Sequence, residues 1–233
     1  FYPLANATLA DAFIRLRQMD SASFYIQRAA AHEPKRKNRA RYLFISGQLL
    51  EGMNQLDSAR LAYVMIRELK RKAPRNILIE AKIKQSILNP SLEFEEKQDE
   101  VARLLNNYEN EPYAHSIHSA LAKMYLNQGE DSLALAYFDK SLQAATVDSY
   151  TEIQNYQELV RYYFENGSYI ETGQYLDRLL SFFDPSSTRY KQLSRQLENL
   201  SDVIIYEETV KETDSILKLF ALNTFLKDLL HLS

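Results

Sequence analysis

Residues 121–141 read LAKMYLNQGEDSLALAYFDKS, and this stretch decides the fold. A small residue, Ala122, follows a leucine, and Tyr125 comes three residues later. Gly129 then precedes a second small residue, Ala134, and a second aromatic residue, Phe138. Two antiparallel helices approach closely only where small residues lie at their crossing, and glycine suits a tight turn. The stretch therefore predicts a helical hairpin that turns at Gly129.

The same pattern returns along the chain. Gly167 follows Gly129 by 38 residues, and Ala59 follows Ala22 by 37 residues. Equivalent positions hold Leu159, Val160, Tyr163, Thr172 and Leu176 downstream, and Ala10, Phe13, Ile26, Gly47, Leu50 and Tyr63 upstream. This spacing is that of the tetratricopeptide consensus. It predicts an all-α, tetratricopeptide-type superhelical solenoid of about five helical hairpins with capping C-terminal helices.

The predicted repeats span residues 1–35, 36–74, 75–112, 113–149 and 150–187. The third is degenerate, because Asn89-Pro90 should end its first helix and lengthen its turn. A capping helix is predicted over 188–208, then a polar linker and an amphipathic terminal helix over 209–233. The apolar face of this last helix includes Ile216 and Leu217. Packing against this chain is favoured over docking to a partner.

The composition excludes several classes of site. The chain has 233 residues with 5 Gly and 6 Pro, which favours long helices over a sheet with many turns. Since it has no Cys, it has no disulfide and no thiolate ligand or nucleophile. No apolar run is long enough to span a bilayer. The opening residues do not form a signal sequence, so we expect a segment of a longer protein, with any lipid anchor outside it.

No pattern of catalytic residues is present. The sequence lacks a glycine-rich nucleotide loop, a nucleophile elbow and a His-Glu-x-x-His segment. His115 and His118 could share one helix face, but zinc sites normally use three or four protein ligands, so a surface pair is the favoured interpretation. We therefore expect no enzyme activity, no metal and no cofactor.

Two basic clusters interrupt a chain whose net charge is −3: Lys35, Arg36, Lys37, Arg39 and Arg41, and then Lys70, Arg71, Lys72 and Arg75. Both are interpreted as helix ends, where cations complement the C-terminal dipole. Nucleic-acid binding is the disfavoured alternative, because an extended basic stripe with stacking aromatic residues is absent.

A basic groove is a further hypothesis. The residue after the small position of each first helix is Gln48, then Lys82, Lys123 and Arg161. In tetratricopeptide arrays that position generally faces the concave surface. We therefore predict that an acidic partner segment contacts a groove formed by Arg41, Phe44, Gln48, Lys82, Lys123, Asn127 and Arg161.

The repeat region resembles a known family. Residues 39–49 read RARYLFISGQL and are followed by Leu56-Asp57-Ser58-Ala59, and together they resemble the SprE/PorW family of tetratricopeptide lipoproteins. The likeness continues through residues 81–83, 141–146 and 214–219, which read AKI, SLQAAT and DSILKL. It covers much of the chain, to about Leu219.

This resemblance implies an accessory component of the type IX secretion system and gliding motility. The implied protein is a periplasmic scaffold anchored to the outer membrane, and it links the secretion ring to the motor subunits. Its partners are proteins, with no nucleic acid. An alternative is a tetratricopeptide sensor or regulator that binds a signalling peptide. A lipoprotein signal in the flanking sequence would favour the first, and a fused DNA-binding or kinase domain the second.

Overall fold

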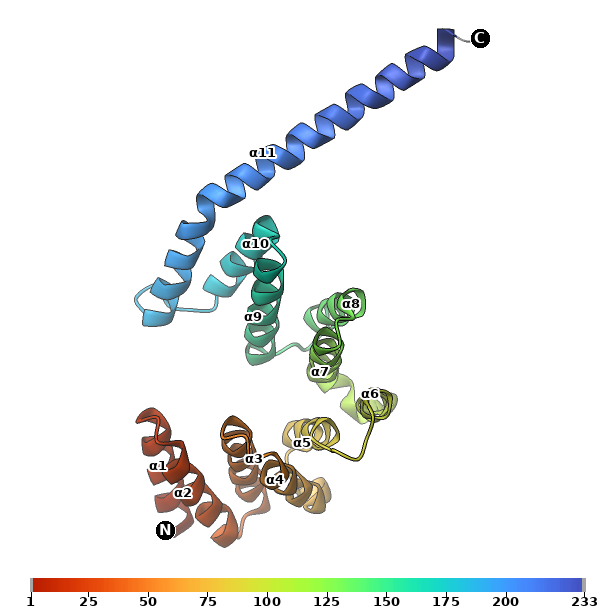
Figure 1. The fold of residues 1–233 in the computed structure, drawn as a ribbon. Helices are drawn as coiled ribbons and strands as arrows, with labels where there is room; N and C mark the ends of the chain where they lie inside the picture. Colours follow the sequence, from red (N-terminus) through yellow and green to blue (C-terminus); the bar gives the residue numbers. More distant parts are fainter. Residues whose placement is uncertain (1, 232–233) are drawn as a thin grey trace. The chain divides into compact units, whose positions relative to one another are not determined.

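Helices account for nearly all of the chain (Figure 1). The computed structural model describes the backbone of residues 2–231 and the side chains of residues 2–218. The α-helices are α1 (Tyr2–Arg15), α2 (Met19–His32), α3 (Arg36–Gly52), α4 (Leu56–Glu68), α5 (Arg75–Ile87), α6 (Phe94–Ala102), α7 (Ala114–Asn127), α8 (Asp131–Leu142), α9 (Ser149–Glu165), α10 (Tyr169–Leu180) and α11 (Thr188–His231). Short 3-10 helices are η1 (Lys70–Lys72), η2 (Arg103–Asn106) and η3 (Tyr108–Tyr113). The predicted all-α class of helical hairpins is confirmed.

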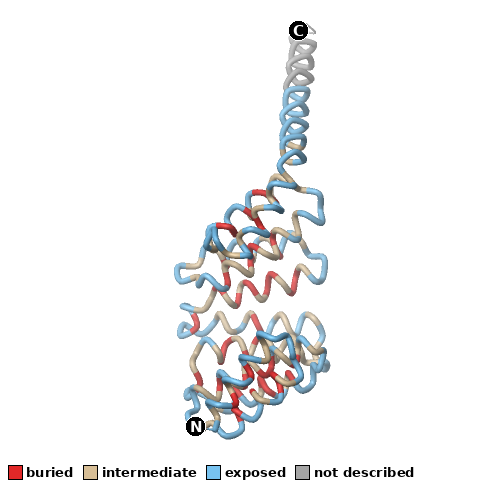
Figure 2. The backbone as a smooth tube through the Cα atoms, turned by 90° about the vertical axis from the view of Figure 1, so that its left-hand side faces the viewer, coloured by how far each residue is buried: buried red, intermediate tan, exposed pale blue. Residues whose placement is uncertain are grey.

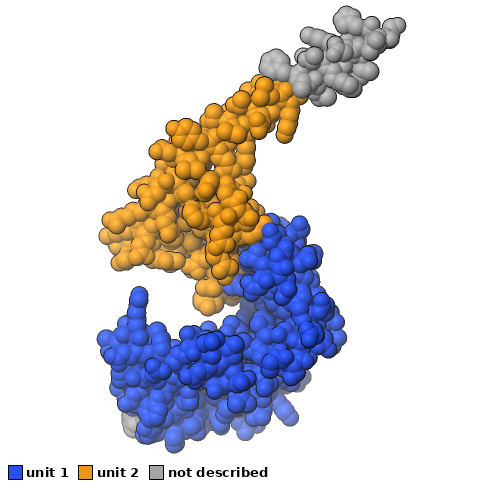
Figure 3. All heavy atoms as spheres, viewed as in Figure 1, with its two compact units in different colours: residues 1–147 blue, residues 148–233 orange. Residues whose placement is uncertain are grey.

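The chain divides into two compact units, residues 1–147 and 148–233 (Figure 3). In the first unit α1 packs on α2, α3 on α4, and α7 on α8. In the second unit α9 packs on α10, and α10 packs on α11. Consecutive antiparallel helices are therefore the structural element of both units.

Small residues lie where the helices of a hairpin cross. Ala22, Ala59, Ala122 and Ala134 are each 0% exposed, and Gly47 is buried. Buried positions recur along each of these helices between exposed ones (Figure 2). The positions that the sequence predicted as crossing points therefore belong to the core.

Four hairpin turns have the same geometry. At each turn one residue has a positive φ: Arg17 (58°), Asn54 (59°), Gly129 (77°) and Gly167 (71°). The amide of the next residue donates to a carbonyl five residues earlier, as from Glu130 N to Tyr125 O at 3.0 Å and from Ser168 N to Tyr163 O at 2.9 Å. This Schellman arrangement satisfies carbonyl groups at the end of the first helix. A search of the sequence for glycine alone therefore does not find the turns at Arg17 and Asn54.

Aromatic residues fill the hairpins in two ways. Tyr63 and Phe138 are fully buried, at 0% and 1% exposed. Other rings form stacked pairs across three hairpins, with centroids 5.4 to 5.5 Å apart, and all but the buried Tyr125 are half-buried: Phe13 with Tyr25, Tyr125 with Tyr137, and Tyr163 with Tyr175. Much of the aromatic content is therefore explained by packing within hairpins.

Helix α11 corrects the prediction of a polar linker after residue 208. The segment is part of one helix of 44 residues, Thr188–His231. It contains no glycine and no proline, so nothing in the sequence ends a helix there. The polar residues of 208–214 occupy exposed helical positions instead, and Glu207 is half-buried.

At the start of the terminal apolar face, two described side chains do not show the predicted packing. Ile216 and Leu217 are 53% and 60% exposed. The remaining apolar side chains of that face, from Leu219 onward, lie outside the described residues. Earlier in α11, Leu193 is buried and Ile204 lies against Gly173 of α10. The first half of α11 is thus the part that packs on α10.

A carboxylate from α11 caps the N-terminus of α10. Ser168 precedes α10 but makes no side-chain capping bond. Instead, Oε2 of Glu207 accepts hydrogen bonds from the amides of Tyr169 at 2.7 Å and Ile170 at 3.0 Å. Lys211 Nζ lies 2.9 Å from the other oxygen of Glu207. The first amides of a helix lack partners within the helix, so this contact ties α11 to α10.

We expect Glu207→Gln to destabilise the second unit by about 0.3–1 kcal/mol at neutral pH, because glutamine keeps an acceptor for the two amides but loses the charge that the start of α10 and Lys211 stabilise. The hydrogen bond from Lys211 and those from the two amides hold the pKa of Glu207 below its ordinary value. A carboxyl with a lowered folded-state pKa contributes fully above its unfolded pKa, about 4.3, and its contribution is lost as the pH falls through the folded pKa.

The difference between parent and Glu207→Gln should therefore shrink on acidification below about pH 4. Urea unfolding at several pH values measures it, with the exposed neighbour Glu208→Gln as the matched control. A Glu207→Gln effect that does not change with pH would contradict the role of the ionised carboxylate.

Candidate functional site

The structure separates the seven predicted groove residues into two groups. Arg41, Phe44 and Gln48 lie on α3 at spacings that share one helix face, Lys82 lies on α5, and Lys123 and Asn127 lie one turn apart on α7. All six belong to the first unit, where α5 packs against both α3 and α7. Arg161 lies on α9 in the second unit.

Exposure divides these residues further. Arg41, Gln48, Asn127 and Arg161 are exposed, whereas Lys82 and Lys123 are half-buried. Phe44 is also half-buried, and its ring lies 5.7 Å from that of Tyr63. Because Phe44 packs on the core in this way, its part in a partner contact is limited to the exposed edge of the ring.

Lys82 lies in a cationic neighbourhood. Burial is the largest cause that lowers its pKa, and the charges of Arg75 and Arg67 lower it further. Arg67 is held by a hydrogen bond from its Nη1 to Gln85 Oε1 at 2.6 Å. A carboxylate brought to this surface would relieve the repulsion among the three cations.

Arg75 is fixed by a network of its own. Its Nε and Nη2 donate to Asn110 Oδ1 at 2.8 and 2.6 Å, and its Nη1 lies 3.0 Å from Glu109 Oε2. The buried Asn110 also donates to the carbonyl of Leu104 at 2.7 Å. The N-terminal end of α5 is therefore a rigid support for Lys82.

Positive charge is distributed unevenly over the other groove positions. Arg161 Nη2 lies 2.6 Å from Glu158 Oε2, so much of its charge is neutralised within α9. Lys123 also has an interaction of its own. The surface around Lys82 is consequently the best-supported part of the predicted groove, and the role of the whole groove stays a prediction.

The two histidines of α7 are not the surface pair that the sequence suggested. His115 is 3% exposed, and His118 is half-buried with its ring 5.8 Å from that of Tyr137. Burial, and then the charge of Lys140, lower the pKa of His118. Within the described residues no group of three His, Asp or Glu side chains could hold a metal ion.

The first basic cluster also lies elsewhere than expected. Arg36 is the first residue of α3, so Arg36, Lys37 and Arg39 occupy the start of a helix and not a C-terminal end. In the second cluster, Lys70, Arg71 and Lys72 follow α4 and form η1, as a C-terminal position requires, whereas Arg75 begins α5. The helix-dipole explanation therefore holds for the three residues of η1 and is wrong for Arg75 and for the first cluster.

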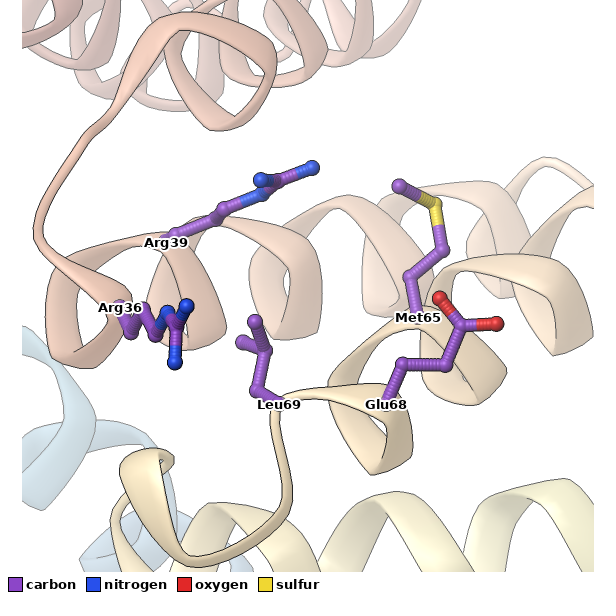
Figure 4. A pocket seen from close by; sticks show the side chains of 5 residues that line it. All are labelled: Arg36, Arg39, Met65, Glu68 and Leu69. Atoms are coloured by element: carbon purple, nitrogen blue, oxygen red, sulfur yellow. The ribbon is translucent and has the colours of Figure 1, made fainter.

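A hollow of about 280 Å³ lies between the start of α3 and the end of α4. Arg36 and Arg39 line it from α3, and Met65 and Glu68 line it from α4, with Leu69 between them (Figure 4). Sequence reasoning missed this hollow, because its lining combines residues from two different helices.

A second hollow of about 440 Å³ lies at the equivalent place between the start of α7 and the end of α8. Five of its lining residues follow the first five by 75 residues, which is two repeats: Glu111, Ala114, Lys140, Gln143 and Ala144. The hairpin architecture thus produces the hollow, and the sequence decides its lining. Only the first of these two hollows is lined by arginines.

No helix among the described residues combines the length and the apolar character needed to cross a membrane.

Comparisons with known proteins return little. No family model matches the sequence, and no curated protein matches it. One similar solved structure comes from a functional characterisation of PilF of Pseudomonas aeruginosa. Its TM-score is 0.44 at 16% sequence identity, over 82% of this chain and 81% of that one. A likeness of this size carries no functional argument.

Proposed function

We propose that this chain is a non-catalytic scaffold that binds other proteins. Repeated helical hairpins offer extended surfaces for binding proteins, since each hairpin adds one more strip of side chains. The observation that carries the proposal is the position of Lys82, half-buried beside Arg67 and Arg75 on a rigid support. Glu109 pairs with Arg75, and the positive charge that Lys82 and Arg67 add to this surface favours a partner segment of the opposite sign.

We further propose a place for this scaffold in the type IX secretion and gliding-motility machinery. The support is the ordered resemblance to the SprE/PorW family, in residues 39–49, 56–59, 81–83, 141–146 and 214–219. In that role the chain would bridge periplasmic ring and motor subunits. The full-length protein would be anchored to the outer membrane by a lipid attached outside this segment.

A pull-down from detergent-solubilised envelopes tests both levels of the proposal. The baits are the parent chain, Lys82→Glu and the matched control Arg15→Glu, which makes the same change in charge outside the predicted groove, where an exposed ion pair with Asp11 exists. We expect the parent and Arg15→Glu to recover ring or motor subunits, and Lys82→Glu to lose most of them. Circular dichroism checks that Lys82→Glu stays folded.

The other outcomes separate the alternatives. Equal recovery by all three baits would keep the scaffold and contradict the contact at Lys82. Recovery of soluble signalling proteins in place of envelope subunits would contradict the secretion role and favour the sensor. Recovery of no protein by any bait would contradict the scaffold itself.

A further inference from the structure

Two arginines line the first hollow, and five more cations follow or precede its lining residues in the sequence. We refer to all seven as the basic edge: Lys35, Arg36, Lys37, Arg39, Lys70, Arg71 and Lys72. The first four precede or begin α3, and the last three form η1 directly after Leu69. The hollow joins the two groups, because Arg36, Arg39 and Leu69 all line it. A chain with a net charge of −3 therefore has one strongly positive edge.

The protein itself neutralises little of this charge. Within the described residues, no side chain of the basic edge forms an ion pair. The nearby carboxylates are Glu33, which accepts a hydrogen bond from the amide of Lys35 at 2.9 Å, and Glu68, which lines the hollow. Two carboxylates leave most of seven positive charges uncompensated.

The fold does not benefit from cations at the start of α3. The first turn of this helix has no acidic residue, and Lys35 provides no side-chain cap. Cations near the positive end of the helix dipole are unfavourable by about 0.3–1 kcal/mol each. Arg39 Nε is buried and makes no hydrogen bond within the described residues. Stability therefore does not explain these residues, whereas an anionic partner would.

The lining of the hollow indicates which kind of anion fits. Met65, which is 40% exposed, and Leu69 provide apolar surface between the arginines and Glu68. A nucleic acid carries a phosphate at every nucleotide and so could not keep its charge away from Glu68, and no aromatic ring among the lining residues could stack on a base. A peptide can match both the charged and the apolar part of the lining. Its acidic side chains can pair with the arginines, and an apolar side chain can pack on Met65 and Leu69.

We propose that the basic edge binds an acidic protein segment whose apolar side chain enters the hollow between Arg36, Arg39, Met65 and Leu69. This inference rests on the proposed scaffold function and assigns it a second contact surface, distinct in its residues from that around Lys82. The equivalent hollow at α7 and α8 does not share the specificity, because Glu111 and Ala114 replace the two arginines there.

Fluorescence anisotropy with two synthetic peptides tests the proposal. One is a short run of aspartate and glutamate with a central leucine, and the other has serine in place of that leucine. We expect the leucine peptide to bind the parent chain about tenfold more tightly than the serine peptide. Arg36→Glu should weaken the leucine peptide about tenfold or more. Lys140→Glu, the same charge change in the second hollow, should leave binding within about twofold.

Two further features keep the result interpretable. Arg36→Glu places an anion at the start of α3, which favours the helix, so lost binding cannot be attributed to unfolding. Met65→Ser changes an exposed side chain and should abolish the preference for leucine over serine. If both peptides bind equally to the parent, the apolar half of the proposal fails. If Arg36→Glu and Lys140→Glu have equal effects, the assignment to the basic edge fails.

Polyanion controls separate the other partner classes. A single-stranded oligonucleotide or a phosphatidylglycerol vesicle that binds more tightly than the leucine peptide, and loses affinity in Arg36→Glu, would overturn the proposal in favour of phosphate recognition. If these binding tests fail while envelope proteins are still recovered through Lys82, the scaffold function stands and only the contact at the basic edge is wrong. The two proposals can therefore fail independently.

Discussion

Replacing Phe138 by alanine should lower the free energy of unfolding of the first unit by about 3–5 kcal/mol. Phe138 is 1% exposed on α8, the helix that packs along α7. Removal of a buried ring loses its transfer free energy and leaves a cavity that surrounding side chains fill only in part. Hairpins contact mainly their neighbours, so the loss should concentrate in α7 and α8.

Urea unfolding followed by circular dichroism measures the Phe138→Ala change, and amide hydrogen exchange locates it. Leu133→Ala is the matched control, because Leu133 lies on the same helix but is 45% exposed. We expect that control to change stability by no more than about 0.5 kcal/mol. Similar losses in both variants would mean that α8 does not bury the face described here.

The spacing of small and aromatic residues was sufficient to predict the fold class. The reason is geometric, since a close helix crossing accepts only residues such as Ala122 and Ala134. Two of the hairpin turns were harder to predict, because Arg17 and Asn54 adopt the left-handed conformation that glycine takes at Gly129 and Gly167. Hydrogen bonds of the neighbouring backbone hold them there, and composition does not reveal those bonds.

Two sequence interpretations failed where the repeat register was not applied to polar residues. His115 lies 75 residues after Ala40, which is fully buried, so the register itself places this histidine in the core. The interpretation of the cluster at Arg36 as a C-terminal helix end is wrong, because Arg36 begins α3, whose start has no side-chain cap. Positively charged residues at a helix start depart from the usual preference for capping and acidic residues there. Such departures are expected where a surface serves binding more than stability.

The hollows could not be predicted from the sequence in the same way. Each lies between the start of one helix and the end of the next, and its chemistry depends on residues from both. Once the repeat register is known, however, the 75-residue offset shows that the two hollows use equivalent positions but are lined by different residues. A repeat array can therefore vary its binding surfaces while its crossing residues stay small.

Gly47→Ala should destabilise the first unit by about 1–3 kcal/mol, although alanine is normally the better helix former. A Cβ at position 47 would lie 2.5 Å from Cζ and 2.6 Å from Cε1 of Tyr63. That ring is fully buried, and its hydroxyl donates to Glu51, whose second oxygen accepts a hydrogen bond from Lys84 Nζ at 2.9 Å. The ring is therefore held at its far end and cannot move aside without breaking this network.

The same helix provides the control for this prediction. A Cβ at Gly52 would meet no atom within 4 Å, so Gly52→Ala should instead stabilise the chain by about 0.5–1 kcal/mol. Urea unfolding of the two variants should thus give opposite signs. Tyr63→Leu in the Gly47→Ala background tests the cause, because leucine lacks the atoms that clash. The two changes combined should cost less than the sum of their separate effects, and simple additivity would show that the ring is not the obstacle.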